Sequence, residues 1–161
     1  MAIKVKINID WEKVKEETIR EIDERVAIAF ERASEKAVTW AKENKGYSTQ
    51  SGALSSSTGY QLYKDGSLLR ERFEKSESGT DENGAKAKGI AAGKVAAEQR
   101  ASELGAHICT VIVAGMPYAA HVENTGHDVL AGAENQFMAI LEEEMQKAFA
   151  ESDVPYSIIT D

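Results

Sequence analysis

The chain has 161 residues, a formal net charge of −8 and a single cysteine. This length is typical of one domain and is sufficient to bury a core without disulfide bonds. The acidic balance argues against general nucleic-acid binding, which depends on cationic side chains that neutralise phosphates, and one cysteine excludes an internal disulfide.

The first forty-four residues predict a strand followed by a long helix. Residues 3–9 alternate apolar and polar side chains, the period of a half-buried strand, and they resemble neither a signal peptide nor a membrane span. Asp10 stands at the N-cap of a helix that we expect over residues 11–44, where apolar side chains recur at three- and four-residue steps. Such a helix measures about 50 Å when straight. Because a compact domain of this size is roughly 40 Å across, the helix must overhang, bend or break.

A loop and a β-hairpin follow the long helix. Small polar residues over 47–57 predict a loop with a short helical turn around Ala53-Leu54. Strands are expected over residues 58–63 and 68–74. The intervening Asp65-Gly66 pair is typical of tight hairpin turns with positive φ.

A second helix and a buried strand are predicted in the second half of the chain. Residues 76–84 are polar and predict a loop, and residues 85–104 are rich in Ala, Lys and Glu, as in a helix. Gly89 and Gly93 each cost about 1 kcal/mol relative to Ala in a helix interior, and they permit close packing against a neighbouring element. Residues 108–114 are almost entirely apolar and predict a buried strand.

The remaining residues complete the expected fold. Residues 119–123 form a short segment after a Pro117-Tyr118 turn, residues 134–151 a helix with one apolar face, and residues 154–161 a tail or an edge strand. Together the patterns predict a single α+β domain over residues 1–161. A long N-terminal helix and a closing C-terminal helix would pack on a mainly antiparallel sheet of about four or five strands.

The polar residues form no recognisable catalytic motif. His121 and His127 flank Glu123, but their six-residue step differs from the three- or four-residue step that brings ligands together on a helix. Serines 55–57 lack the glycine-flanked turn that exposes a nucleophile. We therefore expect no catalytic residue, metal or cofactor. A small metal-dependent hydrolase or nuclease using His121, Glu123 and His127 is an alternative.

Two residues near these histidines have more than one interpretation. Tyr118 is expected as a core aromatic, and Glu123 either as an exposed carboxylate or as an acceptor for the backbone N–H groups of the Thr125-Gly126 bend. The alternative for both is a contact between subunits. Charge allows such a contact, because residues 134–161 have a net charge of −6 and residues 84–105 a net charge of +2. Complementary charge can orient a head-to-tail interface, although ordinary solvated faces explain the same pattern.

Two segments resemble sequence blocks of one family. Residues 49–60, TQSGALSSSTGY, precede a strand and the Asp65-Gly66 turn, and they resemble the "T-G-x-L-R-x-S" block of bacteriophage tail-completion, or head–tail joining, proteins. Residues 117–123, PYAAHVE, precede the Gly126 bend and resemble the "Y-A-x-Y-V-E-x-G-T" block of the same family. The order of the elements also matches over roughly residues 1–150. The matching residues are Gly52, Leu54, Pro117, Tyr118, Ala119, Val122, Glu123 and Gly126.

The chain departs from these blocks at several positions. Ser51 stands where the family usually has Thr, Ser55 where it has Arg, and His121 where it has a second Tyr. Residues 124–126, Asn-Thr-Gly, invert the usual Gly-Thr order. A guanidinium contact at position 55 is therefore absent from this chain.

The resemblance implies a structural subunit of a long-tailed phage or prophage. Copies of the chain would form a ring at the neck or tail end, in contact with connector or tail-tube proteins. The family implies no catalytic residue and no cofactor. The charge and the hydropathy pattern of the sequence predict no sequence-specific nucleic-acid partner and no membrane. The protein would occupy the host bacterial cytoplasm during assembly and the virion neck or tail afterwards. A regulatory protein-binding module is a second alternative.

Overall fold

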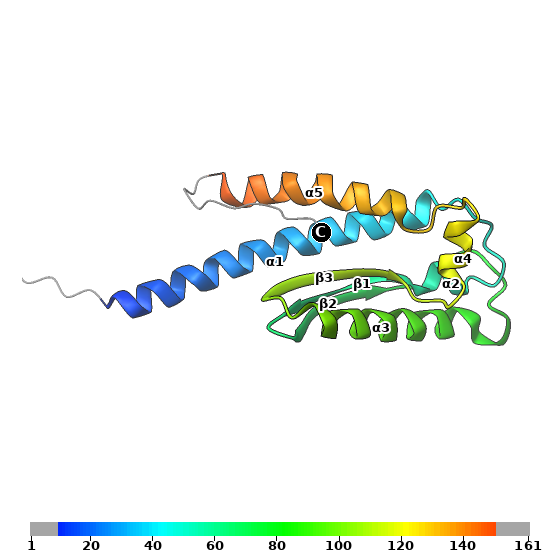
Figure 1. The fold of residues 1–161 in the computed structure, drawn as a ribbon, viewed down its shortest axis with the longest axis horizontal. Coiled ribbons are helices and arrows are strands. Elements are labelled where there is room, and N and C mark those ends of the chain that lie inside the picture. Colours follow the sequence, from blue (N-terminus) through cyan, green and yellow to red (C-terminus); the bar gives the residue numbers. More distant parts are fainter. Residues whose placement is uncertain (1–9, 151–161) are drawn as a thin grey trace, which may run out of the picture.

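The computed structural model describes residues 10–150. Over this part of the chain, five α-helices and a three-stranded antiparallel sheet form an α+β fold (Figure 1). The helices are α1 (Trp11–Glu43), α2 (Ala53–Ser57), α3 (Ala85–Leu104), α4 (Ala119–Asn124) and α5 (Ala131–Phe149). The strands are β1 (Thr58–Lys64), β2 (Ser67–Phe73) and β3 (Ile108–Ala114), and a short 3₁₀ turn, Glu82–Gly84, precedes α3.

The sheet has the order β2-β1-β3, with β1 antiparallel to both neighbours. Asp65 and Gly66 join β1 to β2 with φ of 49° and 76°, which confirms the predicted positive-φ hairpin turn. All three strands begin and end within one residue of the predicted positions. The expected fourth and fifth strands were assigned to residues 3–9 and 154–161, which lie outside the described residues, and the described sheet has three strands.

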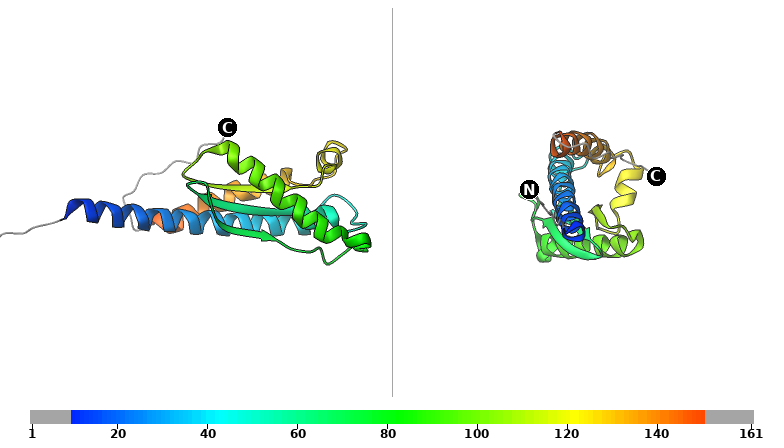
Figure 2. Two further views of the ribbon diagram at one scale, coloured as in Figure 1. Left: turned by 90° about the horizontal axis from the view of Figure 1, so that it is seen from below. Right: turned by 90° about the vertical axis from the view of Figure 1, so that its left-hand side faces the viewer.

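Helices cover both faces of the sheet, with α1 and α5 on one side and α3 on the other (Figures 1 and 2). On the α1 side, Val38 packs against Tyr60 and Leu62 of β1. The Ser34 and Thr110 hydroxyls, 2.9 Å apart, tie α1 to β3. Residues of β3 with even numbers therefore face α1, and those with odd numbers face α3, because successive side chains alternate across a strand.

Helix α5 packs along the middle of α1. The small residues Ala29 and Ala33 lie beneath Leu141 and Met145, and the Phe30 and Phe137 rings meet edge to face with centroids 6.2 Å apart. Burial of these side chains is the main stabilising contribution to the helix pair. The last helix was predicted over residues 134–151 and begins three residues earlier, at Ala131.

The long helix is continuous and overhangs the fold, one of the three outcomes expected from its length (Figure 1). Asp10 caps it as predicted, accepting a hydrogen bond from the backbone N–H of Lys13 at 3.1 Å. Every residue from 11 to 21 is exposed, and we call this stretch the arm. Its apolar side chains Trp11, Val14 and Ile19 are 69%, 44% and 48% exposed, so the predicted apolar stripe is buried only beyond the arm.

Helix α3 approaches its neighbours closely at Gly89 and Gly93. A Cβ atom at Gly89 would lie 2.2 Å from the carbonyl oxygen of Ala53, and one at Gly93 would lie 2.5 Å from that of Ser57. Neither distance is possible for a real Cβ. The glycines that weaken the helix therefore bring α3 against the backbone of α2, as the sequence predicted.

Candidate functional site

The two segments that carry the family resemblance meet at one end of the fold. Helices α2 and α4 lie together at the end opposite the arm (Figure 1). Leu54, Ala119 and Val129 are buried there in one apolar cluster, with Tyr47 and Val122 packed against it. We call residues 47–55 and 117–130 the motif junction.

Gly52 positions the first segment. Its φ of 82° is left-handed, and a Cβ would lie 2.7 Å from the Cε of Lys86 and 2.8 Å from the carbonyl oxygen of Ser78. Both the backbone angle and the available space therefore require glycine. The chain can then turn directly into α2, which places Leu54 in the apolar cluster.

The serines after Gly52 have structural partners. Ser57 Oγ donates to the carbonyl oxygen of Leu54 at 2.7 Å, and Ser56 Oγ accepts from the backbone N–H of Ser76 at 2.8 Å. The short helical turn predicted around Ala53-Leu54 is present, but it extends to Ser57 as a buried helix, so the prediction of a loop is wrong for residues 55–57. Hydroxyls that bond locally to the backbone make a serine-rich run compatible with burial.

A cavity of about 260 Å³ lies between the two segments. Tyr47, Leu54, Tyr118 and Val122 are among its lining residues. Burial raises the pKa of Tyr47 to about 12, whereas Tyr118 is 42% exposed and is not the core aromatic expected from the sequence. Thr49 Oγ1, from another lining residue, is buried without a hydrogen-bond partner among the described residues. The cavity thus combines apolar and aromatic surface with one hydroxyl, that of Thr49, that has no hydrogen-bond partner among the described residues.

Glu123 joins α4 to the start of α5. Its carboxylate accepts hydrogen bonds from the backbone N–H groups of Leu130 at 3.1 Å and Ala131 at 2.9 Å. The first N–H groups of a helix have no partner within the helix, and a carboxylate there is also favoured by the helix dipole. Neither predicted environment of Glu123 is found, because the side chain is half-buried and bonds to residues beyond the Thr125-Gly126 bend.

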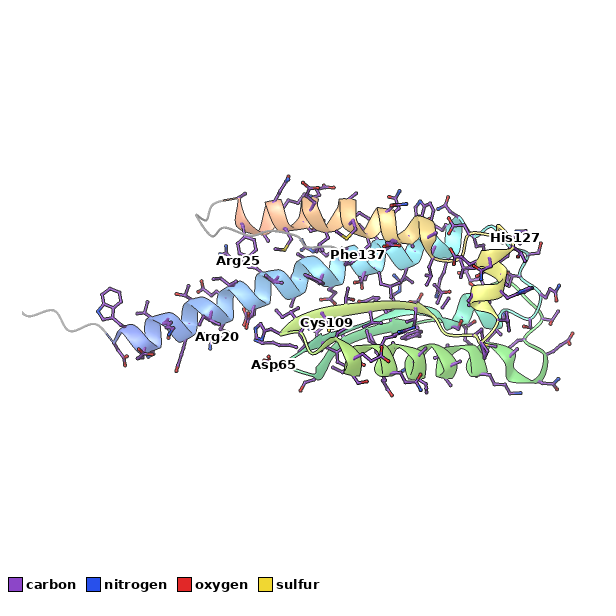
Figure 3. All side chains as sticks on the ribbon, in the orientation of Figure 1. Arg20, Arg25, Asp65, Cys109, His127 and Phe137 are labelled. Atoms are coloured by element: carbon purple, nitrogen blue, oxygen red, sulfur yellow. The ribbon has the colours of Figure 1, made fainter. Side chains whose placement is uncertain are left out.

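The histidines of the metal-site alternative have separate environments. His127, labelled in Figure 3, has its Nδ1 2.7 Å from the carbonyl oxygen of Gly46, a contact that ties the segment after α4 to the chain leaving α1. His121 is exposed. Glu123, placed between them in the sequence, is engaged by backbone N–H groups. Within residues 10–150, no group of three or more His, Cys, Asp or Glu side chains could hold a metal ion.

A second polar cluster lies where the arm leaves the fold. His107 Nδ1 is 2.6 Å from Asp65, and its Nε2 is 3.0 Å from Asp23, which also pairs with Lys64 at 2.7 Å. Hydrogen bonds to Asp65 and then Asp23 raise the pKa of His107, while Lys64 chiefly lowers that of Asp23. The sequence did not predict this cluster, because His107 lies 42 positions from Asp65 and 84 positions from Asp23 in the chain. Only the pairing of Lys64 with Ile108 across the sheet places Asp65 beside His107.

No family model, curated protein or solved structure gives a match to this chain. None of the helices within residues 10–150 is long and apolar enough to cross a membrane.

Proposed function

We propose that this protein is a structural subunit of a long-tailed phage or prophage, of the head–tail joining or tail-completion class, and that it acts by assembling into a ring. The observation that carries the proposal is the motif junction. Two blocks that resemble the same family, far apart in the sequence, pack Leu54 and Ala119 into one cluster. If both blocks derive from one family, their contact in space is the expected arrangement, and it supports the proposal.

The arm and the motif junction suit a head-to-tail contact between copies. They lie at opposite ends of the fold (Figure 1), so a contact between the arm of one copy and the body of the next uses two different surfaces. Contacts of this kind close into a ring when the rotation between copies permits it. Trp11, at the outer end of the arm, is the type of aromatic residue that anchors interfaces.

The cavity at the motif junction supports a binding role rather than catalysis. Tyr118 lies partly exposed among apolar side chains, and the unpaired Thr49 hydroxyl offers one polar contact to a partner. Two nearby side chains of types that often act as acids or bases, Glu123 and His127, make hydrogen-bond contacts with backbone groups instead. These contacts hold the motif junction together. A connector or tail-tube protein, or a neighbouring copy, is the expected occupant of this surface.

Electron microscopy of the purified protein mixed with phage connectors or tail tubes tests the proposal. Rings seated at one end of these particles are the expected result. A Trp11→Ala/Ile19→Ala variant should lose the rings and keep its thermal stability, because both side chains are exposed on the arm. Glu17→Ala, also on the arm, is the matched control and should assemble normally. Absence of ordered particles with every connector and tube tested would refute the assignment.

A further inference from the structure

Strand β3 forms an edge of the sheet, and within residues 10–150 no strand pairs with its outer side. Its sequence, Ile-Cys-Thr-Val-Ile-Val-Ala, contains no charge and no proline. The opposite edge strand, β2, carries Arg70, Glu71 and Arg72. Proteins usually protect open edges with charges, prolines or bulges, because an unpaired edge is a template for another strand. β2 has this protection and β3 does not.

Grooves run along the open edge of β3. Every residue from Thr110 to Gly115 lines a groove of about 830 Å³. Because alternate side chains of a strand point to opposite faces, consecutive residues line one groove only where the edge itself is accessible. A second groove, of about 450 Å³, adjoins the same strand at Thr110 and Ile112 on the α5 side. The edge is therefore reachable from both faces of the sheet.

The two walls beside this edge differ in chemistry. On the α5 side, Ile112 lies with Leu130 and Phe137, and Figure 3 shows Phe137 on the side of α5 that faces the rest of the fold. On the α3 side the groove is bordered by Gln99, Arg100 and Glu103. An added strand would fit this site if it presented apolar side chains on one face and polar side chains on the other.

Residues 3–9 of the chain have this pattern. Ile3, Val5, Ile7 and Ile9 occupy alternate positions, with Lys4, Lys6 and Asn8 between them. We infer that residues 3–9 of a second copy of this chain add to the outer edge of β3 as a fourth strand, with their isoleucines and valine toward Phe137 and their lysines toward α3.

The arm prevents the same pairing within one chain. Asp23 contacts His107 at the beginning of β3, and Asp10 lies 13 residues before Asp23, about 20 Å along the helix at 1.5 Å per residue. Residue 3 can lie at most roughly 24 Å from Asp10, given about 3.4 Å per extended residue. A strand folded back from Asp10 would therefore only just reach the beginning of β3. Since β3 extends away from that point, the partner must be another copy.

Cys109 provides a direct test, because it lies in β3 with its side chain toward α3 (Figure 3). A chain carrying Lys6→Cys and Cys109→Ser is co-expressed with a differently tagged chain of native sequence, purified and oxidised. Because a disulfide requires Cβ atoms about 3.5–4.5 Å apart, we expect disulfide-linked heterodimers with Cys109 chiefly from whichever of positions 4, 6 and 8 lies directly opposite it, each position being tested in its own variant. Cysteine at position 5 or 7 faces the other side of the sheet and should give at least tenfold less linked product. Lys13→Cys, on the exposed arm, measures linkage by random collision.

Three results would overturn the inference: no heterodimer from cysteine at position 4, 6 or 8, a yield from position 5 or 7 equal to the best of these three, or a disulfide formed within a single chain that retains both the introduced cysteine and Cys109. The last result would mean that residues 3–9 pair with β3 of their own chain. Thermal unfolding of the Cys109→Ser chain checks its fold. If that chain is unstable, homodimers of the Lys6→Cys chain with native Cys109, identified by mass spectrometry of the linked peptides, give the same answer.

The choice of a second copy as the occupant rests on the proposed ring assembly, but the two proposals fail separately. Crosslinking uses only the isolated protein and tests strand addition. Seating of rings on connectors or tail tubes tests the phage role. If the protein forms linked heterodimers but never binds these particles, strand addition is supported and the proposed function is refuted. If it binds the particles but forms no linked heterodimers, the proposed function is supported and strand addition is refuted.

Discussion

Replacing Glu123 tests whether this motif residue stabilises the fold or acts only at a contact between subunits. Its carboxylate accepts hydrogen bonds from the Leu130 and Ala131 N–H groups at the start of α5. Glu123→Ala removes both bonds and the charge, whereas Glu123→Gln keeps one acceptor oxygen. Glu134 lies exposed in the first turn of the same helix, so Glu134→Gln removes a carboxylate from the same helix terminus without removing these bonds.

The expected magnitudes follow from what each variant removes. Loss of a capping side chain costs about 0.5–2 kcal/mol, and loss of a carboxylate beside a helix N-terminus costs about 0.3–1 kcal/mol. Because Glu123 supplies two bonds and is half-buried, we expect Glu123→Ala to lower the free energy of unfolding by about 2 kcal/mol. Glu123→Gln should cost about 1 kcal/mol and Glu134→Gln a few tenths.

Urea unfolding followed by circular dichroism measures these differences. With an m-value of about 2 kcal/mol/M, typical of small proteins, Glu123→Ala should lower the midpoint by about 1 M and Glu134→Gln by roughly 0.2 M. If Glu123→Ala and Glu134→Gln shift the midpoint equally, the hydrogen bonds to Leu130 and Ala131 contribute nothing and the assigned role of Glu123 is wrong. A variant with unchanged stability but lost assembly would make Glu123 an interface residue instead.

Three further predictions address the core, the glycine contacts and the polar cluster at the base of the arm. Leu141→Ala, in the buried α1–α5 contact, should cost about 2–5 kcal/mol of unfolding free energy, and a loss below 1 kcal/mol would contradict that packing. Gly93→Ala should destabilise by about 1–3 kcal/mol through overpacking despite the better helix propensity of Ala, whereas Lys88→Ala on the exposed face of α3 should be neutral in the same urea titration. The raised pKa of His107 means that its stabilising contribution is complete below its ordinary pKa of 6.5 and is lost as the pH rises through the raised value. An NMR titration should show this pKa fall in Asp65→Asn, and an unchanged value would exclude the Asp65 contact.

The elements with a strong local pattern were predictable from the sequence. The hairpin followed from Asp65-Gly66 between two short alternating runs, and both residues have the positive φ that this turn requires. Residues 85–104 and 108–114 match α3 and β3 at both ends. Periodicity and turn chemistry act over a few residues, and one sequence contains all the information needed to recognise them.

Contacts between distant segments were not predictable in the same way. The capping of α5 by Glu123 depends on how α4 folds back onto Leu130, and the His107 cluster depends on the β1–β3 register. Burial of Ser56 and Ser57 required knowledge that neighbouring backbone and hydroxyl groups would bond to them. A polar run on its own is equally typical of a loop, so the pattern favoured a loop for residues 55–57, which belong to the buried helix α2.

The arm and the open edge of β3 are both costly for an isolated molecule. An exposed helix with Trp11 at its outer end leaves apolar surface in water, and an uncharged edge strand invites nonspecific pairing. A second copy that supplied a strand to β3 would cover both features at once, because residues 3–9 are tethered directly to the arm. In the proposed assembly, the position of the arm would determine where that copy lies. The long helix would then act as a spacer that prevents self-pairing and directs the strand to a neighbour, as a head-to-tail ring requires.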